Sequence, residues 1–411
     1  MNTDAKIAIL GYGIEGKSTE KYLQSHGFVN ISILDGKDIF DDLKKYEYIF
    51  RTPGISPLHP AFVQAKKDGV VITSHIEYFY KHCPAKIVAV TGTKGKGTTS
   101  SLIQKIIEQS DRKCFLGGNI GLPPLNFLDE VTADDIVVLE TSSFQSFQLD
   151  AAPYVGVALM VTSEHLDYHA DIQEYVDAKA DLFIGQKSSD HLVYNSDFER
   201  TKEIAKKSLA KKYTFSLDDE HEGFLCIDGE KIIKISEICL LGKHNWNNVL
   251  AAVHVAHILG VSVADMKQAV SEFSGLPLRL EVVAEKNGIL YVNDSFSTTP
   301  ETTLAALESF AEKDAVVFLG GSDKKSDYSD LVEYIQNHKN VVPFCFGETG
   351  KILFSLIGEK AYYHEFLSES FEAAQKINTP GSVCLLSPAS ASLDQFDNYK
   401  VRGEYFTKLC T

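Results

Sequence analysis

The sequence predicts an α/β protein of three domains. Short apolar runs that suit buried parallel strands alternate with longer amphipathic stretches, as in sheets covered by helices. The chain of 411 residues is also too long for one hydrophobic core, because single cores stop growing near about 250–300 residues. Two breaks in the pattern, one near residue 83 and one near residue 275, predict domains at 1–83, 84–275 and 276–411.

The first third of the chain begins with a strand, a glycine-rich turn and a helix. The expected strands are 6–10, 31–34 and 48–50, with a helix over 15–26. The turn GYGIEG at 11–16, with Asp35 at the end of the second strand, has the GxGxxG spacing of a dinucleotide site. A close-packed turn that binds no ligand would have the same pattern, so both interpretations stay open.

The middle third opens with the strongest motif. A strand at 87–90 runs into TGTKGKGTT at 91–99, and a helix follows. Such a loop offers backbone N–H groups to phosphates, Lys96 would neutralise the β- and γ-phosphates, and a hydroxyl would hold Mg²⁺. Because Gly97 follows Lys96, we expect Thr98 to supply that hydroxyl. The alternative is a surface turn, which the strand–loop–helix context disfavours.

Four further side chains in the middle third could carry chemistry. Strands are expected at 136–139 and 155–161. Glu140 ends the first of them, where a Mg²⁺ ligand lies in nucleotide enzymes, although a helix-capping carboxylate fits equally well. His165 and His169 are four residues apart and are metal ligands or a solvated helix start, the second being favoured for His169. Lys179 has the pattern of a surface lysine on a helix.

The last third begins at the segment GLPLR, which predicts a linker at 275–279. Buried strands between helices are expected at 289–292, 315–319, 341–346 and 382–386.

Composition excludes several classes of function. The 56 acidic residues exceed the 40 basic ones, giving a net charge of −16, so we expect no nucleic-acid partner. The seven cysteines are scattered without a CxxC pair, which argues against a disulfide framework or a zinc site. The N-terminus lacks the features of a signal peptide, and no apolar run approaches about 18 residues. We therefore expect a cytoplasmic protein without a membrane segment.

Taken in order, the motifs resemble those of the Mur ligase family, above all its glutamate-adding branch. The resemblance runs almost from end to end. Besides the two glycine-rich loops it includes GGNIG (117–121), ETSSFQ (140–145), GKHNWNN (242–248), RLEVV (279–283), NDS (293–295), LGG (319–321) and LSPASASLDQF (386–396). The last segment, with Tyr399 and Arg402 after it, is specific to the glutamate-adding branch.

This resemblance implies a fold and a reaction. The fold would be a Rossmann-like UDP-binding domain, a central P-loop ATPase-type domain with a parallel sheet, and a Rossmann-like C-terminal domain that binds glutamate. The reaction would use ATP to convert the carboxylate of UDP-N-acetylmuramoyl-L-alanine into an acyl phosphate. The amine of glutamate, D-glutamate in the first instance, would then attack it in peptidoglycan synthesis. The implied cofactors are ATP and two Mg²⁺ ions, and the expected protein is a monomer.

The resemblance also implies site residues. The catalytic group would be Lys96, Glu140, His165 and Lys179. The metal ligands would be Thr98, Glu140, His165 and a carbamylated Lys179. ATP would contact Gly92, Thr93, Lys94, Gly95, Lys96, Gly97, Thr98, Asn245, Asn248, Arg279 and Asp294. The UDP-sugar would contact Gly11, Gly13, Ile14, Glu15, Asp35, Thr52, Gly54 and Asn119. Glutamate would contact Thr298, Lys324, Ser392 and Tyr399.

Two departures from the family pattern keep alternatives open. Lys94 and Gly97 replace the usual asparagine and serine or threonine, which makes the loop look like that of folylpolyglutamate synthase, a related glutamate ligase. Phe296 stands where the glutamate-adding members commonly have lysine, so an enzyme that adds L-glutamate is a second possibility.

The remaining hypotheses are weaker. A folate ligase is disfavoured because the turn at 11–16 with Asp35 implies an N-terminal nucleotide domain, which folate ligases lack. A regulatory nucleotide-binding protein without catalysis is disfavoured because the lysines, the glutamate and the histidine of the implied catalytic group are all retained.

Overall fold

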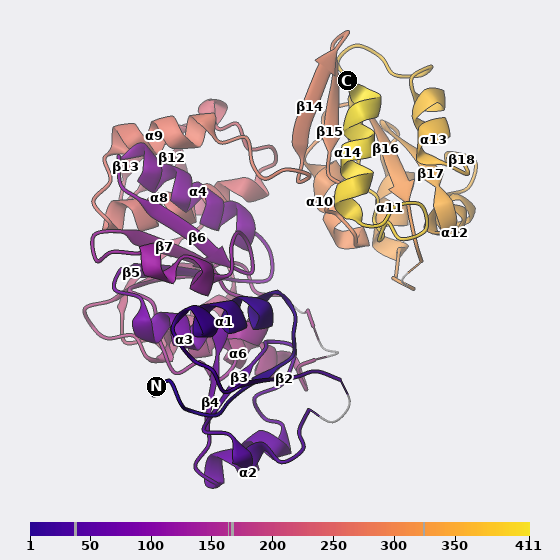
Figure 1. The fold of residues 1–411 in the computed structure, drawn as a ribbon. Helices are drawn as coiled ribbons and strands as arrows, with labels where there is room; N and C mark the ends of the chain where they lie inside the picture. The colour runs from indigo at the N-terminus through magenta and orange to yellow at the C-terminus, as the bar shows by residue number, and fades with distance from the viewer. Residues whose placement is uncertain (37–38, 163, 166–167, 324) are drawn as a thin grey trace. The chain divides into compact units, whose positions relative to one another are not determined.

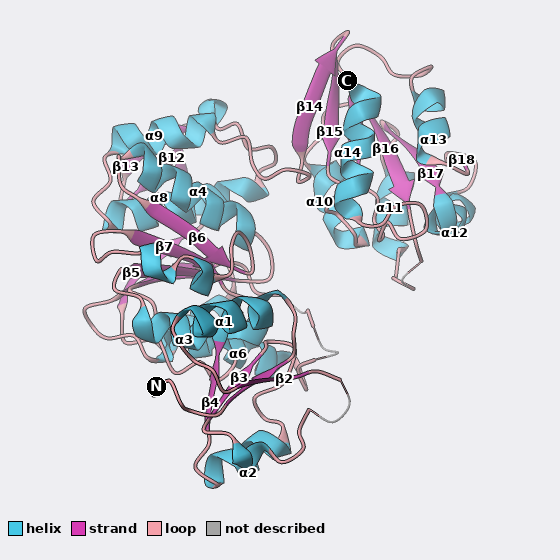
Figure 2. Cartoon of the chain, in the orientation of Figure 1, coloured by secondary structure: helices cyan, strands magenta, loops and turns pink. Residues whose placement is uncertain are grey.

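The computed structural model describes every residue except 37–38, 163, 166–167 and 324 (Figure 1). The chain forms two compact units. Unit 1 comprises Met1–Ile238 with Trp246–Glu272, and unit 2 comprises Cys239–Asn245 with Phe273–Thr411. Helices and strands alternate through both units (Figure 2). None of the helices that the structure describes has the length and apolar character needed to cross a membrane.

The first sheet of unit 1 is parallel, with strand order β2-β1-β3-β4. Its strands are β1 (Ile7–Leu10), β2 (Ile31–Leu34), β3 (Tyr48–Arg51) and β4 (Val71–Ser74). Its helices are α1 (Ile14–Ser25), η1 (Leu43–Lys45), α2 (Pro60–Lys67) and α3 (His75–His82). Because strand residues alternate between faces, Ala8 and Leu10 pack with Phe62 of α2, whereas Ile7 and Ile9 pack with Leu23 of α1. Helices therefore cover both faces of this sheet.

The second sheet of unit 1 is parallel and larger, with strand order β10-β9-β8-β5-β7-β6. Its strands are β5 (Lys86–Thr91), β6 (Cys114–Gly118), β7 (Ile136–Glu140), β8 (Val155–Ala158), β9 (His191–Asn195) and β10 (Lys211–Phe215). The helices of this region are α4 (Lys96–Gln109), η2 (Pro124–Asn126), η3 (Leu128–Glu130), α5 (Ser143–Ser146), α6 (Ile172–Ile184), α7 (Glu199–Lys206), α8 (His244–Ile258) and α9 (Val263–Glu272).

A small antiparallel sheet follows the large one in the chain. It consists of β11 (Glu220–His221), β12 (Phe224–Ile227) and β13 (Glu230–Lys234), flanked by η4 (Leu217–Asp219) and η5 (Ile235–Glu237).

Unit 2 contains one sheet of order β14-β15-β19-β16-β17-β18, in which only β14 runs antiparallel to its neighbour. Its strands are β14 (Glu281–Lys286), β15 (Ile289–Asn293), β16 (Ala315–Gly320), β17 (Val341–Phe346), β18 (Tyr362–His364) and β19 (Val383–Leu386). Its helices are α10 (Pro300–Glu308), α11 (Ser329–Asn337), α12 (Gly347–Ile357), α13 (Leu367–Ala374) and α14 (Tyr399–Cys410). Residues of α10, α11 and α12 pack on one face, and residues of α13 and α14 pack on the other.

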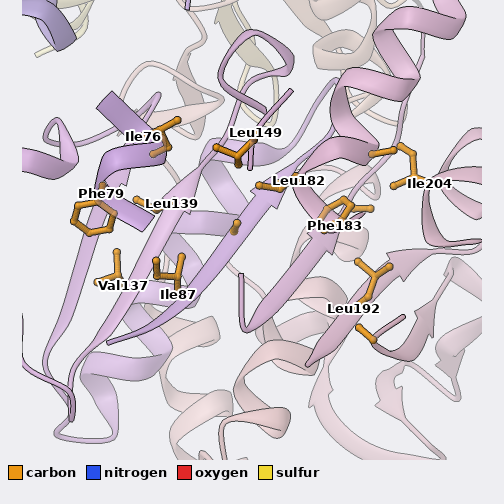
Figure 3. Close-up of a cluster of buried hydrophobic side chains, with 14 of the residues drawn as sticks. Ile76, Phe79, Ile87, Val137, Leu139, Leu149, Leu182, Phe183, Leu192 and Ile204 are labelled. Carbon is orange, nitrogen blue, oxygen red and sulfur yellow. The ribbon is translucent and has the colours of Figure 1, made fainter. Parts of the chain in front are cut away.

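The largest core cluster of unit 1 joins α3 to the second sheet. Figure 3 shows Ile76 and Phe79 of α3 beside Val137 and Leu139 of β7, with Phe183 of α6 in the same cluster. All five side chains are at most 1% exposed. The predicted boundary at 83/84 therefore lies in the short link between α3 and β5, across which the core is continuous. The three domain ranges stay a prediction, whereas the α/β class is confirmed.

The strands expected from apolar runs are present; two of them begin one residue later than predicted, and one ends three residues early. Strand β8 ends at Ala158, whereas the expected strand ran to residue 161. Beyond Ala158 the backbone bonds to the loop after β5: the N–H of Leu159 donates to the Thr91 carbonyl at 2.9 Å, and Thr93 donates to the Met160 carbonyl at 2.8 Å. These residues support the glycine-rich loop and do not extend the strand.

Candidate functional site

Strand β5 lies between β7 and β8, at the point where the strand order of the second sheet reverses. In open parallel sheets such a point leaves a crevice at the carboxyl ends of the strands, where ligands bind. The glycine-rich loop follows β5, Glu140 ends β7, and the segment after β8 bonds to the loop. The fold therefore brings three separate parts of the middle third to one edge of the sheet.

The glycines of the loop are required by its backbone and by its neighbours. Gly92 and Gly95 have φ angles of +152° and +85°, in the region that favours glycine. A Cβ atom at Gly95 would lie 2.2 Å from Oδ1 of Asn248, which accepts a hydrogen bond from Thr99 Oγ1 at 3.2 Å. Gly95 caps the N-terminus of α4, so the first N–H groups of this helix face the loop.

Two lysines converge on the loop carbonyls. Nζ of Lys96 donates to the carbonyls of Gly92 and Thr93, both at 3.0 Å, and Nζ of Lys179 donates to the Gly92 carbonyl at 3.0 Å. Lys179 is only 1% exposed, so the surface interpretation of this residue is wrong. Burial, and secondly the charge of Lys96, hold the pKa of the Lys179 amine well below its ordinary value. The sequence pattern of α6 did not reveal this, because the helix face that carries Lys179 packs against the glycine-rich loop after β5, which is remote in the chain.

Glu140 is a buried carboxylate at the end of β7, with 5% exposure. Its Oε1 accepts a 2.8 Å hydrogen bond from the side-chain amide of Asn119. The following helix α5 is capped by Ser142, whose hydroxyl accepts from the N–H of Gln145 at 3.3 Å. The helix-capping interpretation of Glu140 is therefore wrong, while Asn119, expected at the UDP-sugar, is in contact with this carboxylate.

The two histidines have different surroundings. The side chain of His165 is 43% exposed and lies 3.7 Å from the carboxylate of Glu164, which in turn lies 3.8 Å from Nζ of Lys94. His169 is 1% exposed, its Nε2 lies 3.0 Å from the hydroxyl of Ser143, and burial lowers its pKa. A solvated helix start is thus wrong for His169. The ring of His165 is accessible, and Glu164 contacts both this ring and Lys94 of the loop.

The loop after β1 in the first sheet is also at a reversal of strand order, between β2 and β3. A Cβ atom at Gly11 would lie 2.3 Å from Oγ1 of Thr52, and one at Gly16 would lie 2.4 Å from the Gly11 carbonyl. Close packing therefore requires both glycines. Asp35 is exposed after β2, and Ile14 in the first turn of α1 is 77% exposed.

Glu15 follows Ile14 and is directed toward the second sheet. Its Oε1 accepts a 2.6 Å hydrogen bond from the amide of Gln145, and burial raises the pKa of the carboxyl. Nearby, the guanidinium of Arg51 donates to the Phe147 carbonyl at 2.9 Å. One oxygen of Glu15 is thus engaged in a protein contact, and the N–H groups at the N-terminus of α1 are the anion-binding groups that this turn offers.

In unit 2, polar residues follow two adjacent strands, β15 and β19. Asp294 comes directly after β15, is 4% exposed and accepts from the hydroxyl of Ser387 at 2.7 Å; burial raises its pKa to about 6. Ser392, beyond β19, is 2% exposed. Thr298 is half-buried, and Tyr399 begins α14.

The other expected contacts of unit 2 have these positions. The Arg279 guanidinium carbon lies 3.8 Å from the centre of the Phe296 ring. The amide of Asn245 donates to the Leu241 carbonyl at 2.7 Å. Lys324 lies outside the described residues.

Two family models match long parts of the chain. The family model described as "Mur ligase middle domain" matches residues 90–256, and "Mur ligase, glutamate ligase domain" matches residues 278–390. A UDP-N-acetylmuramoylalanine--D-glutamate ligase of Clostridium kluyveri is 38% identical over 395 residues, covering 92% of this chain and 86% of that protein. The chain belongs to the Mur ligase family. A protein of the same name from Clostridium botulinum (strain Langeland) is 33% identical, covering 98% of this chain and 96% of the relative.

Solved Mur ligase structures share the fold. The UDP-N-acetylmuramate-alanine ligase MurC of Thermotoga maritima has a TM-score of 0.61 at 20% identity, covering 98% of both chains. The MurF ligase of Thermotoga maritima, solved in complex with ADP, has a TM-score of 0.64 at 18% identity, covering 100% of this chain and 96% of the other. At these identities the similarity concerns the three-domain fold alone.

Three contacts of this Mur ligase could not be predicted from the sequence. Nothing in the motif order indicated that Gln145 bonds Glu15, because the two residues are 130 positions apart. Glu164 had no motif of its own, although it lies between Lys94 and His165. Phe296 departs from the family pattern in the sequence, but nothing there predicts its contact with Arg279.

Proposed function

We propose that this Mur ligase joins D-glutamate to UDP-N-acetylmuramoyl-L-alanine at the expense of ATP, in the cytoplasm and as part of peptidoglycan synthesis. The observation that carries the proposal is the pair of relatives with that ligase name, at 38% and 33% identity over 92% and 98% of the chain. The glycine-rich loop after β5, the partly buried Lys96, and the buried Lys179 and Glu140 are groups of the kind that phosphoryl transfer requires. We expect the protein to act as a monomer.

The proposed chemistry has two steps. A carboxylate resists attack by an amine until one oxygen becomes a leaving group. An oxygen of the substrate carboxylate attacks the γ-phosphorus of ATP, and the bond to ADP breaks, which leaves an acyl phosphate. The amine of glutamate then attacks the acyl carbon, the bond to the phosphate oxygen breaks, and the amine loses a proton as amide and phosphate form.

The residues at the second sheet position and neutralise the phosphates in this proposal. The N-terminus of α4 and the N–H groups of the loop after β5 receive them, as helix N-termini do for anions. Lys96 already lies against the inner carbonyls of the loop, at 3.0 Å from Gly92 and Thr93. From unit 2, Arg279 and Asp294 are the proposed nucleotide contacts, and Asn245 and Asn248 of α8 complete the set.

The donors beside the loop fit Mg²⁺. The hydroxyl of Thr98, the buried carboxylate of Glu140 and the accessible ring of His165 offer oxygen and nitrogen ligands, and hard oxygen ligands are those that Mg²⁺ prefers. When bound, the proposed pair of Mg²⁺ ions would offset phosphate charge. The protein groups named here hold and orient these ligands: Asn119 fixes one carboxylate oxygen of Glu140.

Lys179 is the proposed site of carbamylation. The reaction joins the amine nitrogen to the carbon of CO₂ and releases one proton, and it requires the neutral amine. Burial supplies that form, because it holds the pKa of Lys179 well below the ordinary value. The product would put an anion where the buried amine lies, at the Gly92 carbonyl and within electrostatic reach of Glu140. Restoration of the activity of Lys179→Ala by added formate or acetate would support this role. Full activity of Lys179→Ala without any added acid would contradict it.

The two remaining substrates are assigned to other loops. The UDP-sugar is proposed to contact the turn after β1, with Asp35 after β2, Thr52 and Gly54 after β3, and Asn119. Glutamate is proposed to contact Thr298, Ser392 and Tyr399 of unit 2, together with Lys324.

The test is ATP-dependent phosphate release with UDP-N-acetylmuramoyl-L-alanine and either D- or L-glutamate. We expect turnover with D-glutamate and a loss of at least about 100-fold in Lys96→Ala, the scale of losing one charge-stabilising donor. Lys105→Ala, on the exposed part of the same helix, is the control and should keep wild-type turnover. Turnover with L-glutamate alone would move the protein to the L-glutamate alternative. Full activity of Lys96→Ala would refute the phosphate-loop assignment.

A further inference from the structure

We propose that Phe296 is a positioning residue that orients the guanidinium of Arg279 toward the nucleotide. The inference rests on the proposed function, in which Arg279 contacts ATP, and adds a residue that this function did not assign. Phe296 stands where the glutamate-adding members of the family commonly have lysine, so the role of its ring must differ from that of the lysine.

The ring and the guanidinium form a stack. The guanidinium carbon of Arg279 lies 3.8 Å from the centre of the Phe296 ring, within the range of a cation–π contact. Tyr399 meets the same ring edge-on, with centroids 5.1 Å apart and an interplanar angle of 83°. Phe296 nevertheless remains 39% exposed, so the hydrophobic core does not account for its presence. What the ring supplies at this place is a flat face for the cation.

One backbone hydrogen bond joins the segments of Phe296 and Arg279, and a hydroxyl–carbonyl bond joins the segments of Phe296 and Tyr399. The N–H of Phe296 donates to the carbonyl of Leu278, the residue before Arg279, at 3.0 Å. On the other side, the hydroxyl of Ser295 donates to the Tyr399 carbonyl at 2.8 Å. The three residues of the stack therefore come from segments that are bonded together, and their spacing does not depend on side-chain contacts alone.

The backbone around Arg279 is held in an unusual conformation. Leu278 and Leu280, on either side of it, have φ angles of +63° and +46°, which bulky residues avoid. The N–H of Leu280 donates to Asp294 Oδ1 at 3.2 Å, and a Cβ atom at Gly403 would lie 2.5 Å from the Leu278 side chain. Strain of this kind persists where surrounding contacts impose it, and it clusters at functional sites. Here it sets the direction in which Arg279 leaves the backbone.

The stack then sets the direction of the side chain. A guanidinium that lies on an aromatic ring uses its face for that contact, and its N–H groups point outward in the plane, the geometry in which they donate to phosphate or hydroxyl oxygens. Restricting the long arginine side chain before the ligand arrives lowers the entropy lost on binding. Removal of the ring should therefore weaken nucleotide binding more than the binding of glutamate, because Arg279 lies on the face of the ring whereas Tyr399 meets it only edge-on.

The test compares steady-state constants of Phe296→Leu and Phe296→Tyr. We expect Phe296→Leu to raise the KM for ATP about 3- to 10-fold, the scale of a cation–π contact, with the KM for glutamate within about 2-fold of wild type. Phe296→Tyr keeps the ring and should restore the wild-type KM. Phe354→Leu is the matched control, because Phe354 on α12 is similarly exposed, at 41%, and should leave all constants unchanged.

Arg279→Ala and the double variant Arg279→Ala/Phe296→Leu separate the two levels of the proposal. If Arg279→Ala leaves the KM for ATP unchanged, the nucleotide role of Arg279 in the proposed function fails. If Arg279→Ala raises that KM but Phe296→Leu does not, or if the two effects simply add, the positioning role alone is overturned. A rise confined to the KM for glutamate would also overturn it. Non-additive effects on ATP, with an unchanged melting temperature, support it.

Discussion

The side-chain amide of Gln145 donates a 2.6 Å hydrogen bond to the carboxylate of Glu15. Glu15 lies in the first turn of α1, at the loop proposed for the UDP-sugar, and Gln145 is part of the capping box of α5, just after Glu140. The side-chain oxygen Oε1 of Gln145 accepts from the backbone N–H of Ser142 at 3.0 Å. A chain of hydrogen bonds therefore links the first glycine-rich turn to the segment that carries the proposed metal ligand.

Gln145→Ala should destabilise unit 1 by about 2–3 kcal/mol, because it leaves the buried Glu15 carboxylate without its amide donor. Urea unfolding at pH 7 measures the loss. Gln268→Ala is the control: it removes the same amide–carboxylate pair, to Glu272 at 3.0 Å, from an exposed helix and should cost only a few tenths, about 0.3 kcal/mol. Equal losses in the two variants would contradict the buried contact.

Gly95→Ala should weaken nucleotide binding as well as reduce stability. Gly95 and Gly229 have nearly the same φ, +85° and +83°, but a Cβ atom meets Asn248 Oδ1 at 2.2 Å in the first case and nothing within 4 Å in the second. Both substitutions should cost about 1 kcal/mol of backbone strain. Only Gly95→Ala should also displace Asn248 and raise the KM for ATP. Wild-type kinetics in Gly95→Ala would show that the loop tolerates the displacement.

His75 should make unit 1 sensitive to acid. It is 2% exposed, its ring contacts Thr19 Oγ1 at 2.9 Å and accepts from the Leu125 N–H at 3.2 Å, and burial lowers its pKa to about 3. The unfolded chain, with a histidine pKa near about 6.5, binds the proton first as the pH falls. The stability due to neutral His75 is therefore present above about 6.5 and is lost progressively below it.

From these values, lowering the pH from 7 to 5 should cost unit 1 about 2 kcal/mol through this residue. His75→Gln cannot titrate, and its side chain can still bond to the same two partners. Urea midpoints of wild type and His75→Gln at the two pH values measure the difference. A loss of the same size in both proteins would assign the acid sensitivity to other groups.

Arg402→Lys should destabilise unit 2 by about 2–3 kcal/mol. Arg402 is fully buried and donates to the Ser295 carbonyl and hydroxyl at 3.0 and 3.1 Å and to the Ser390 carbonyl at 3.0 Å. A lysine ammonium lacks the planar set of N–H donors by which the guanidinium reaches all three acceptors. The buried carbonyls of Ser295 and Ser390 therefore cannot both keep their donor. Hydrogen exchange of peptides from β15 and β19 reports the loss. Lys400→Ala, on the exposed side of α14, is the control, and an equally large effect there would argue against the buried network.

Strand prediction succeeded best where both faces of a strand are buried, and the partly buried edge strand β2 was predicted as well. Strands β5, β7 and β16 are buried along nearly their whole length and have continuous apolar runs. The unpredicted strands of the three large sheets are β4, β6, β9, β10, β14 and β18, and all except β9 are at a sheet edge. An edge strand is partly exposed, so its sequence mixes polar and apolar residues without a clear run; β10, with the sequence KKYTF, is an example.

For the site, the sequence by itself determined the chemistry that is local in the chain: a glycine-rich loop between a strand and a helix, with a lysine at its end. Spacing alone encodes that arrangement, because the loop, the strand and the helix are contiguous. Only the tertiary structure decided which distant side chains meet the loop. It buried Lys179 against the Gly92 carbonyl, turned Glu15 toward Gln145, and placed Phe296 under Arg279. Burial and contact between remote segments control pKa and orientation, and neither leaves a periodic mark in a single sequence.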